Sequence, residues 1–205
     1  MNKKNYTVLL TAIVISCLLP LNAFAYTASF KQVAKDSNGT ATLDIRIKDN
    51  MTRIEAVSSG RKIITITNNN GIYNYLPDEN IAVKFPLDQA TKEKIINPVD
   101  YMQFIRDLNT DTSGTEEIDG KLCDIYEYVD KPTSSNVKVW IWKEKEFPVQ
   151  MEFVDPSIGA SLTVFLTDIE INQPIPDDIF DLPQGTKIED MSEYPAVPAS
   201  QNTPK

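Results

Sequence analysis

The chain has 205 residues, 41% of them hydrophobic, and its 29 acidic residues outnumber 20 basic ones to give a net charge of −9. This acidity argues against nucleic acid as a partner, because phosphate binding needs clustered Lys and Arg. The sequence contains no His, which excludes His-activated nucleophiles, His-ligated zinc and His general bases. We therefore predict a protein that is not an enzyme and that uses no cofactor or metal.

Residues 1–25 have the layout of a secretory signal peptide. Lys3 and Lys4 precede an apolar stretch over residues 7–19, and Ala23-Phe24-Ala25 is a small-x-small cleavage site. The apolar stretch is too short to span a membrane comfortably. Removing the segment takes two lysines from the 20 basic residues and leaves 18 against 29 acidic ones, a net charge of −11. The sequence thus predicts export to the periplasm.

A second interpretation of the same segment is a lipid anchor. Val14-Ile15-Ser16-Cys17 fits the box of bacterial lipoproteins in which the Cys becomes lipidated. The residues after Cys17 stay apolar through Phe24, where lipoproteins usually turn polar. Cleavage after Ala25 would give a diffusing protein, whereas a lipidated Cys17 would hold it at the envelope by acyl chains.

From residue 26 the chain is predicted to be β. Residues 42–48 alternate strictly, with Leu43, Ile45 and Ile47 on one side, as in a half-buried antiparallel strand. Further strands are expected at short intervals, over residues 52–57, 62–67, 72–75 and 81–85. This spacing, with turn residues between the strands, is typical of a meander of hairpins.

The alternation then stops between residues 86 and 109. Four apolar residues recur there at helical spacing: Tyr101, Phe104, Ile105 and Leu108. Asp100 is the expected N-cap of this helix. A separate short helix is expected over residues 87–96, and a polar loop over residues 110–120.

Strands resume over residues 122–128, 137–142, 149–154 and 160–167. A short turn is expected at residues 177–180, capped by Asp177 or Asp178. We divide the chain into a signal peptide (1–25), one sheet domain (26–190) and a flexible, Pro-containing tail (191–205). The order of elements predicts a mainly β, α+β domain whose inserted helices cover the apolar face of an antiparallel sheet. If the sheet curves, an apolar cavity results; a filled core would use the same residues.

The acidic loop beginning at Asp107-x-Asn109-x-Asp111 resembles the start of a calcium loop. The sixth position is Thr112 rather than Gly, and the twelfth is Ile118 rather than Glu. A calcium site needs that sharp turn and that bidentate carboxylate, so we interpret the segment as a solvated loop.

Three further features could be read as sites but are also explained by packing or surface pairing. Trp140 and Trp142 share one face of a strand, where they either stack a ligand or pack. Arg53 and Glu55 also share a face, as in a surface ion pair. Cys123, in an alternating strand, is expected to be a buried core thiol.

Five short motifs, taken in chain order, carry a resemblance to a known family. They are Lys48–Glu55, Ile72–Pro77, Ile118–Tyr126, Val139–Val149 and the phrase Pro-Asp-Asp-Ile-Phe-Asp-Leu-Pro-Gln-Gly at 176–185. Across residues 28–188 the ordered set resembles the LolA-like superfamily. That group includes the periplasmic outer-membrane lipoprotein carrier, its outer-membrane receptor and outer-membrane lipoprotein-sorting proteins.

The resemblance implies a strongly curved antiparallel half-barrel with a helical lid over an apolar cavity that shelters acyl chains. Arg53 is the nearest match to the Arg that fastens the lid in the carrier. The sequence departs from the carrier in its reduced helical segment and in the lack of an evident amphipathic helix before Thr42.

The expected ligand is an acyl chain or a lipoprotein, bound by a monomer. The alternative is an envelope protein-interaction or sensor module without lipid cargo. We expect the four helical residues to pack on the sheet face shared by Ile64 and Ile66. The candidate cavity and lid residues are Ile64, Ile66, Val83, Phe85, Tyr101, Phe104, Ile105, Leu108, Val139, Ile141, Met151 and Phe153.

Overall fold

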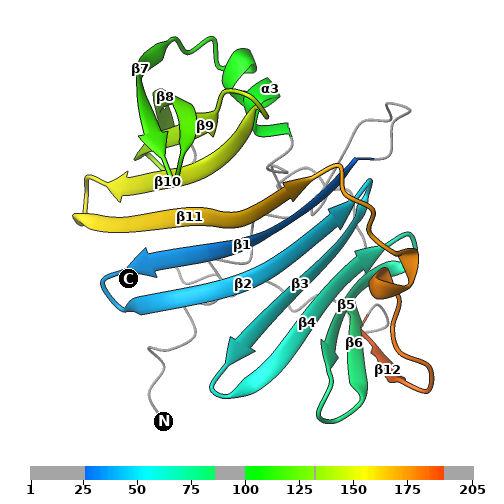
Figure 1. The fold of residues 1–205 in the computed structure, drawn as a ribbon. Coiled ribbons are helices and arrows are strands. Elements are labelled where there is room, and N and C mark those ends of the chain that lie inside the picture. Colours follow the sequence, from blue (N-terminus) through cyan, green and yellow to red (C-terminus); the bar gives the residue numbers. More distant parts are fainter. Residues whose placement is uncertain (1–25, 86–99, 132, 192–205) are drawn as a thin grey trace, which may run out of the picture.

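The computed structural model describes residues 26–85, 100–131 and 133–191. These residues form one large, curved and open sheet of twelve strands (Figure 1). A helix, α3 (Tyr101–Asp107), is inserted between strands, and a 3-10 helix, η2 (Asp177–Phe180), follows the last long strand. The predicted mainly β fold, with a curved sheet and a helical insertion, is confirmed.

The sheet joins two meanders edge to edge. The first consists of β1 (Thr27–Asp36), β2 (Gly39–Lys48), β3 (Met51–Ser58), β4 (Arg61–Asn68), β5 (Gly71–Leu76) and β6 (Ile81–Phe85). The second consists of β7 (Thr112–Ile118), β8 (Lys121–Asp130), β9 (Ser135–Trp142), β10 (Phe147–Asp155) and β11 (Ala160–Ile171). The last strand, β12 (Lys187–Asp190), pairs in parallel with β6. The spatial order is β12-β6-β5-β4-β3-β2-β1-β11-β10-β9-β8-β7.

Tight turns set the register of the hairpins. Between β3 and β4 the two turn residues are Ser59 and Gly60, with φ of 52° and 78°. Asp119 and Gly120 connect β7 to β8 with φ of 48° and 73°. Positive φ at both turn positions matches the right-handed twist of paired strands and favours Gly or Asp there. As a consequence, Arg53 pairs with Ile66 and Glu55 with Ile64 across the β3–β4 hairpin.

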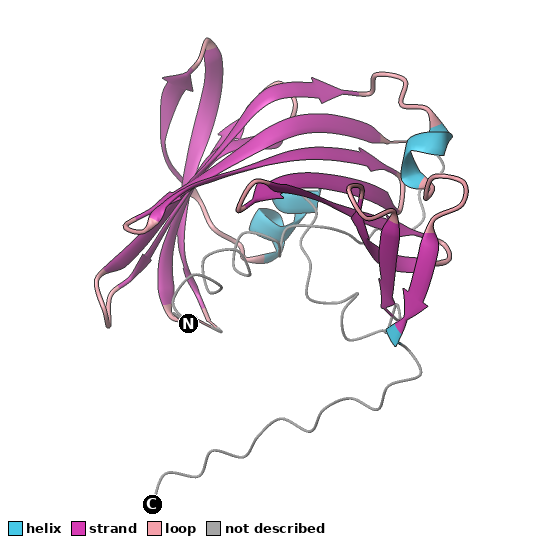
Figure 2. Ribbon diagram, turned by 90° about the horizontal axis from the view of Figure 1, so that it is seen from below, coloured by secondary structure: helices cyan, strands magenta, loops and turns pink. Residues whose placement is uncertain are grey.

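The alternation of side chains divides the sheet into two faces. We call the side on which α3 lies the concave face, and the opposite side the outer face (Figure 2). Ile45 and Ile54, paired across β2 and β3, belong to the concave face. Arg53 and Glu55 belong to the outer face because they alternate with Ile54.

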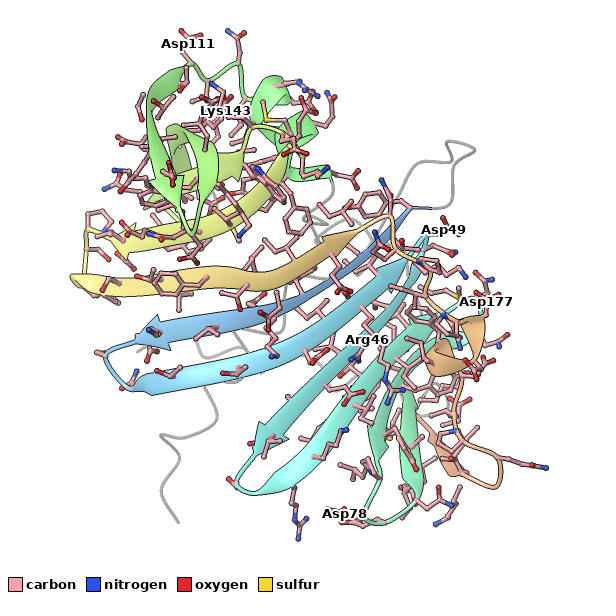
Figure 3. The ribbon with its side chains drawn as sticks, in the orientation of Figure 1. Arg46, Asp49, Asp78, Asp111, Lys143 and Asp177 are labelled. Carbon is pink, nitrogen blue, oxygen red and sulfur yellow. The ribbon has the colours of Figure 1, made fainter. Side chains whose placement is uncertain are left out.

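The main core lies between α3 and the concave face. It contains Phe30, Ile45, Ile47, Met151 and Leu166 among other buried side chains. Phe30 and Phe147 stack edge to face in it, with ring centroids 5.5 Å apart. Charged side chains such as Asp78 and Asp111 lie in turns and loops at the rim of the sheet (Figure 3).

Three expectations from the sequence need correction. Residues 112–118, expected within a polar loop, form the edge strand β7. β12 adds a parallel pair to a sheet that was expected to be antiparallel throughout. Asp177 and Asp178 form no capping hydrogen bond, because the N-cap of η2 is Pro176. The signal peptide, the helix expected over 87–96 and residues 192–205 lie outside the described residues.

Candidate functional site

Helix α3 is fixed to the concave face through aromatic side chains. Tyr101 and Ile105 are buried, and the hydroxyl groups of Tyr101 and Tyr128 are hydrogen-bonded at 2.6 Å. The Phe104 ring packs edge to face against both tyrosines, at centroid distances of 5.6 Å. On the exposed side of the helix, Arg106 pairs with Glu146 at 2.5 Å. The helix is thus tied to β8 and to the β9–β10 turn.

Burial keeps this aromatic contact uncharged. It raises the pKa of the Tyr101 and Tyr128 phenols above the ordinary range for tyrosine. Asp100 occupies the predicted N-cap position but makes no capping hydrogen bond, and burial raises the pKa of its carboxyl. The start of α3 is therefore held by packing rather than by its cap.

The predicted cavity residues on the concave face divide into two groups. Val139, Ile141 and Met151 are buried in the same core as α3, and Phe153 packs partly buried against it. Val83 and Phe85 lie on the β6 part of the concave face, where they are only partly buried. Leu108, at the end of α3, is 37% exposed.

The structure does not place Ile64 and Ile66 beneath α3. Both pair with outer-face residues of β3, namely Glu55 and Arg53. They are buried in a separate cluster with Tyr73, Tyr75 and Ala82, against which Leu182 packs. The expectation that the helix packs on Ile64 and Ile66 is therefore wrong: alternation along β4 turns them away from it.

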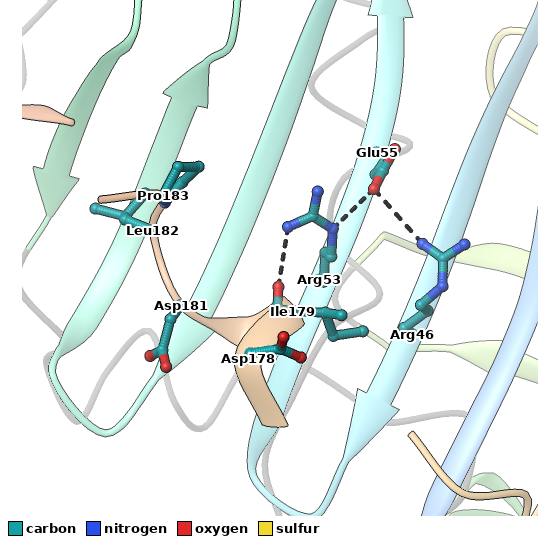
Figure 4. A pocket seen from close by; sticks show the side chains of 8 residues that line it. All are labelled: Arg46, Arg53, Glu55, Asp178, Ile179, Asp181, Leu182 and Pro183. Carbon is teal, nitrogen blue, oxygen red and sulfur yellow. Dashed lines mark hydrogen bonds and ion pairs between the residues drawn. The ribbon is translucent and has the colours of Figure 1, made fainter. Parts of the chain in front are cut away.

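Arg53 has a different role from that expected. Its Nη1 donates to the carbonyl oxygen of Ile179 at 2.9 Å, and its Nε donates to Glu55 Oε1 at 2.7 Å (Figure 4). Ile179 belongs to η2, which lies on the outer face. Among the described residues, Arg53 fastens the C-terminal segment rather than helix α3.

We call residues 175–190 the C-terminal clasp. Lys48, Asn68 and Asn80 donate side-chain hydrogen bonds to three of its carbonyl oxygens, those of Ile175 (2.8 Å), Phe180 (2.9 Å) and Gly185 (3.1 Å). The Phe180 side chain is completely buried. The phrase at 176–185, which carries part of the family resemblance, thus covers the apolar outer face of β4 to β6.

A pocket of about 330 Å³ lies where the clasp crosses β2 and β3 (Figure 4). Its lining residues are Arg46, Arg53, Glu55, Asp178, Ile179, Asp181, Leu182 and Pro183. Glu55 is its central charge, contacting Arg53 at 2.7 Å, Lys62 at 2.5 Å and Arg46 at 3.5 Å. The pocket carries charges of both signs that neutralise one another, as expected of a fastening rather than an anion site.

The ion pairs of Glu55 predict a pH-dependent contribution to stability. Burial opposes ionisation of this carboxyl, but hydrogen bonds and charge from Lys62 and Arg53 outweigh it and lower its pKa. A lowered pKa stabilises the fold above the unfolded value, about 4.3, and the contribution disappears as the pH falls through the folded pKa. Glu55→Gln should therefore lose about 1–2 kcal/mol of unfolding free energy at pH 7.

Urea unfolding at several pH values tests this expectation. The difference between wild type and Glu55→Gln should shrink as the pH is lowered below about 4. Glu117→Gln, at an exposed position of β7, serves as the control and should stay within about 0.5 kcal/mol of wild type. A difference between Glu55→Gln and wild type that does not change with pH would contradict the ion-pair explanation.

The remaining candidate residues, Trp140, Trp142 and Cys123, belong to a packed cluster on the outer face of the sheet. Trp140 is buried on the outer face, and its Nε1 donates to Glu116 Oε2 at 2.7 Å. Trp142 packs against the same outer cluster, which also holds the buried Cys123. Burial raises the pKa of the Cys123 thiol, which disfavours the reactive thiolate.

Two absences hold for residues 26–85, 100–131 and 133–191. No group of three acidic, Cys or His side chains there converges as metal ligands would. No helix in the same residues is both long enough and apolar enough to cross a membrane.

The curved open sheet with its inserted helix is a fold found in several solved structures. An uncharacterised conserved protein from Thermus thermophilus matches with a TM-score of 0.53 and 11% identity, over 80% of this chain and 90% of that one. A structure of the Pseudomonas aeruginosa MucA/MucB complex matches with a TM-score of 0.51 and 10% identity. The match covers 77% of this chain and 56% of that one, so it spans little more than half the length of the matched chain.

The family that the sequence resembles is also represented. A LolA superfamily protein from Nitrosomonas europaea matches with a TM-score of 0.33 and 11% identity, over 78% of this chain and 91% of that one. The solved structures that match thus include a protein of the superfamily that the sequence resembles. No protein-family model and no curated protein matches the sequence.

Proposed function

We propose that the chain is an exported, non-enzymatic binding protein for acyl chains or lipoproteins. The observation that carries this proposal is the uneven covering of the concave face. On the side of β8 to β10, α3 closes the face and buries Val139, Ile141 and Met151. On the side of β4 to β6, apolar side chains remain partly exposed among the described residues.

The partly exposed apolar group is spread over three neighbouring strands. It comprises Ile63 on β4, Ile72 on β5, and Val83 and Phe85 on β6. Ile72 and Phe85 are direct cross-strand partners, so their side chains lie side by side. Apolar side chains gathered on a concave surface are typical of sites for apolar ligands.

The proposed location is the periplasm, and two features support it. Residues 1–25 have the layout of an export signal, and the motifs across residues 28–188 resemble those of the LolA-like superfamily. We propose cleavage after Ala25, which leaves a soluble domain over residues 26–190 and a tail over 191–205. The alternative is an anchor at Cys17, in which case the protein would act at a fixed position in the envelope.

Uptake of a fluorescent fatty acid or a fluorescent lipopeptide by the purified mature protein tests the proposed function. We expect saturable binding near one probe per chain. Phe85→Asp, which places a charge in the exposed apolar group, should weaken binding at least tenfold, since burying an unpaired charge beside the ligand is costly. Val57→Asp, at a position that is 69% exposed, is the matched control. The absence of saturable uptake by wild type would contradict the proposal.

A second candidate function is a protein-interaction module on the same fold. The fold is shared with a structure of the MucA/MucB complex, and β7 is an edge strand. Edge strands pair readily with added strands. A stoichiometric protein partner that is retained from cell envelopes after delipidation would favour this function over lipid binding.

A further inference from the structure

The concave face of β3 to β6 has a polar centre inside an apolar surround. Thr52 of β3 lies directly opposite Thr67 of β4, and both are buried. Beside them, Thr65 donates a hydrogen bond from its hydroxyl to Asn74 Oδ1 at 2.9 Å. The surrounding residues on the same face are apolar: Ile54, Ile63, Ile72, Val83 and Phe85.

Thr52 is the member of this centre with unused hydrogen-bonding capacity. Its side chain is completely buried, and its hydroxyl finds no hydrogen-bond partner in the described part of the chain. A buried hydroxyl without a partner costs about 1–3 kcal/mol. A polar ligand group that reaches this hydroxyl as the covering atoms move aside would remove that cost.

The same face restricts what that polar group is. Among the described residues of β3 to β6 whose side chains lie on the concave face, Arg61 is the only charged one. That residue is at the tip of the β3–β4 hairpin, 73% exposed and paired with Glu79. An ionised ligand group beside Thr52 would thus lose its water without gaining a counter-ion, which is strongly unfavourable.

We infer that the polar centre selects a neutral amphiphile, an alkyl or acyl chain that carries an amide, ester or alcohol group. The Thr52 hydroxyl donates to the oxygen of that group, and the apolar surround contacts the chain. This inference rests on the proposed function and narrows its ligand class. It disfavours both free fatty acid anions and plain hydrocarbons.

Three probes of equal chain length test the inference. Decanamide, decanoate and decane, each delivered from the same cyclodextrin, compete with a bound fluorescent apolar dye at pH 7.5. Wild type should bind decanamide most tightly. Thr52→Val, which keeps the shape of the side chain, should weaken decanamide by about threefold to tenfold and leave decane within about twofold. Thr52→Ser should restore decanamide binding, and Thr42→Val, at an exposed position, should change nothing.

The stability of the ligand-free variants supplies a second readout. Thr52→Val replaces an unpartnered hydroxyl by a methyl group, so its Tm should stay equal or rise. Thr65→Val removes a formed hydrogen bond, so its Tm should fall. A lower Tm for Thr52→Val would show that the hydroxyl is already satisfied and would overturn the inference.

The outcomes separate the inference from the proposed function. In one outcome, wild type binds all three probes while Thr52→Val affects them alike or not at all. That result would overturn the selective role of the polar centre and leave the proposed binding function intact. Binding of no probe by wild type would overturn both.

Discussion

Phe180→Ala is expected to lower the free energy of unfolding by about 3–5 kcal/mol. The Phe180 side chain is completely buried where the C-terminal clasp covers the outer face of the sheet, and its own carbonyl oxygen is held by Asn68. Because η2 lies against β3 and β4, truncation leaves a cavity between η2 and these strands. Chemical unfolding, followed by Trp fluorescence and by circular dichroism, measures the loss.

The neighbouring exposed residue provides the control for this prediction. Asp181→Ala changes the same segment at an exposed position and should stay within about 0.5 kcal/mol of wild type. A loss below about 1 kcal/mol for Phe180→Ala would mean that the clasp adds little to the fold, contrary to its burial and hydrogen bonds.

Ile105→Ala is expected to cost about 2–5 kcal/mol of unfolding free energy. Its side chain is 1% exposed and belongs to the core between α3 and the concave face. Helix α3 has seven residues, which is too short for stability on its own, so its order depends on this packing. Hydrogen exchange of the α3 amides should accelerate in the variant by more than that of β4.

Leu108→Ala is the matched control for Ile105→Ala. Leu108 is at the C-terminal end of the same helix but is 37% exposed, so its truncation should cost less than about 1 kcal/mol. Equal losses in the two variants would indicate that α3 is not seated as described.

The strands with one buried face were predictable because alternation is a local signal. The strict pattern of residues 42–48 identified β2, and it reappears in the structure as buried Leu43, Ile45 and Ile47. The polar strand β7 had no such signal, because both of its faces are largely exposed at the edge of the sheet. The two-residue turn Asp119-Gly120, directly before a predicted strand, was the available clue, since it requires a partner strand ahead of it.

The face of the sheet on which each residue of β3 and β4 lies could also be predicted from the sequence. A two-residue turn at Ser59-Gly60 fixes which residues of β3 and β4 are opposite one another. It places Ile64 and Ile66 with Glu55 and Arg53, away from the face of Ile54. The run Ile63-Ile64 is a sign that both faces of β4 carry apolar side chains.

The clasp was not predictable in the same way. The motif at 176–185 resembles a family motif, but nothing local indicates which surface it covers. Its position depends on side chains far along the chain: Lys48, Arg53, Asn68 and Asn80. The pairing of Thr52 with Thr67 follows from the same turn at Ser59-Gly60, but the complete burial of Thr52 depends on tertiary packing and has no local signal.

Native mass spectrometry of the protein purified gently from its own cell envelope tests the central claim most directly. We expect a chain that begins at Tyr26 and carries about one molecule of a neutral amphiphile, which is lost on Phe85→Asp substitution. An N-terminus at an acylated Cys17 would establish the anchored form without affecting the binding claim. A chain that carries no lipid and takes none up when it is offered would contradict the account.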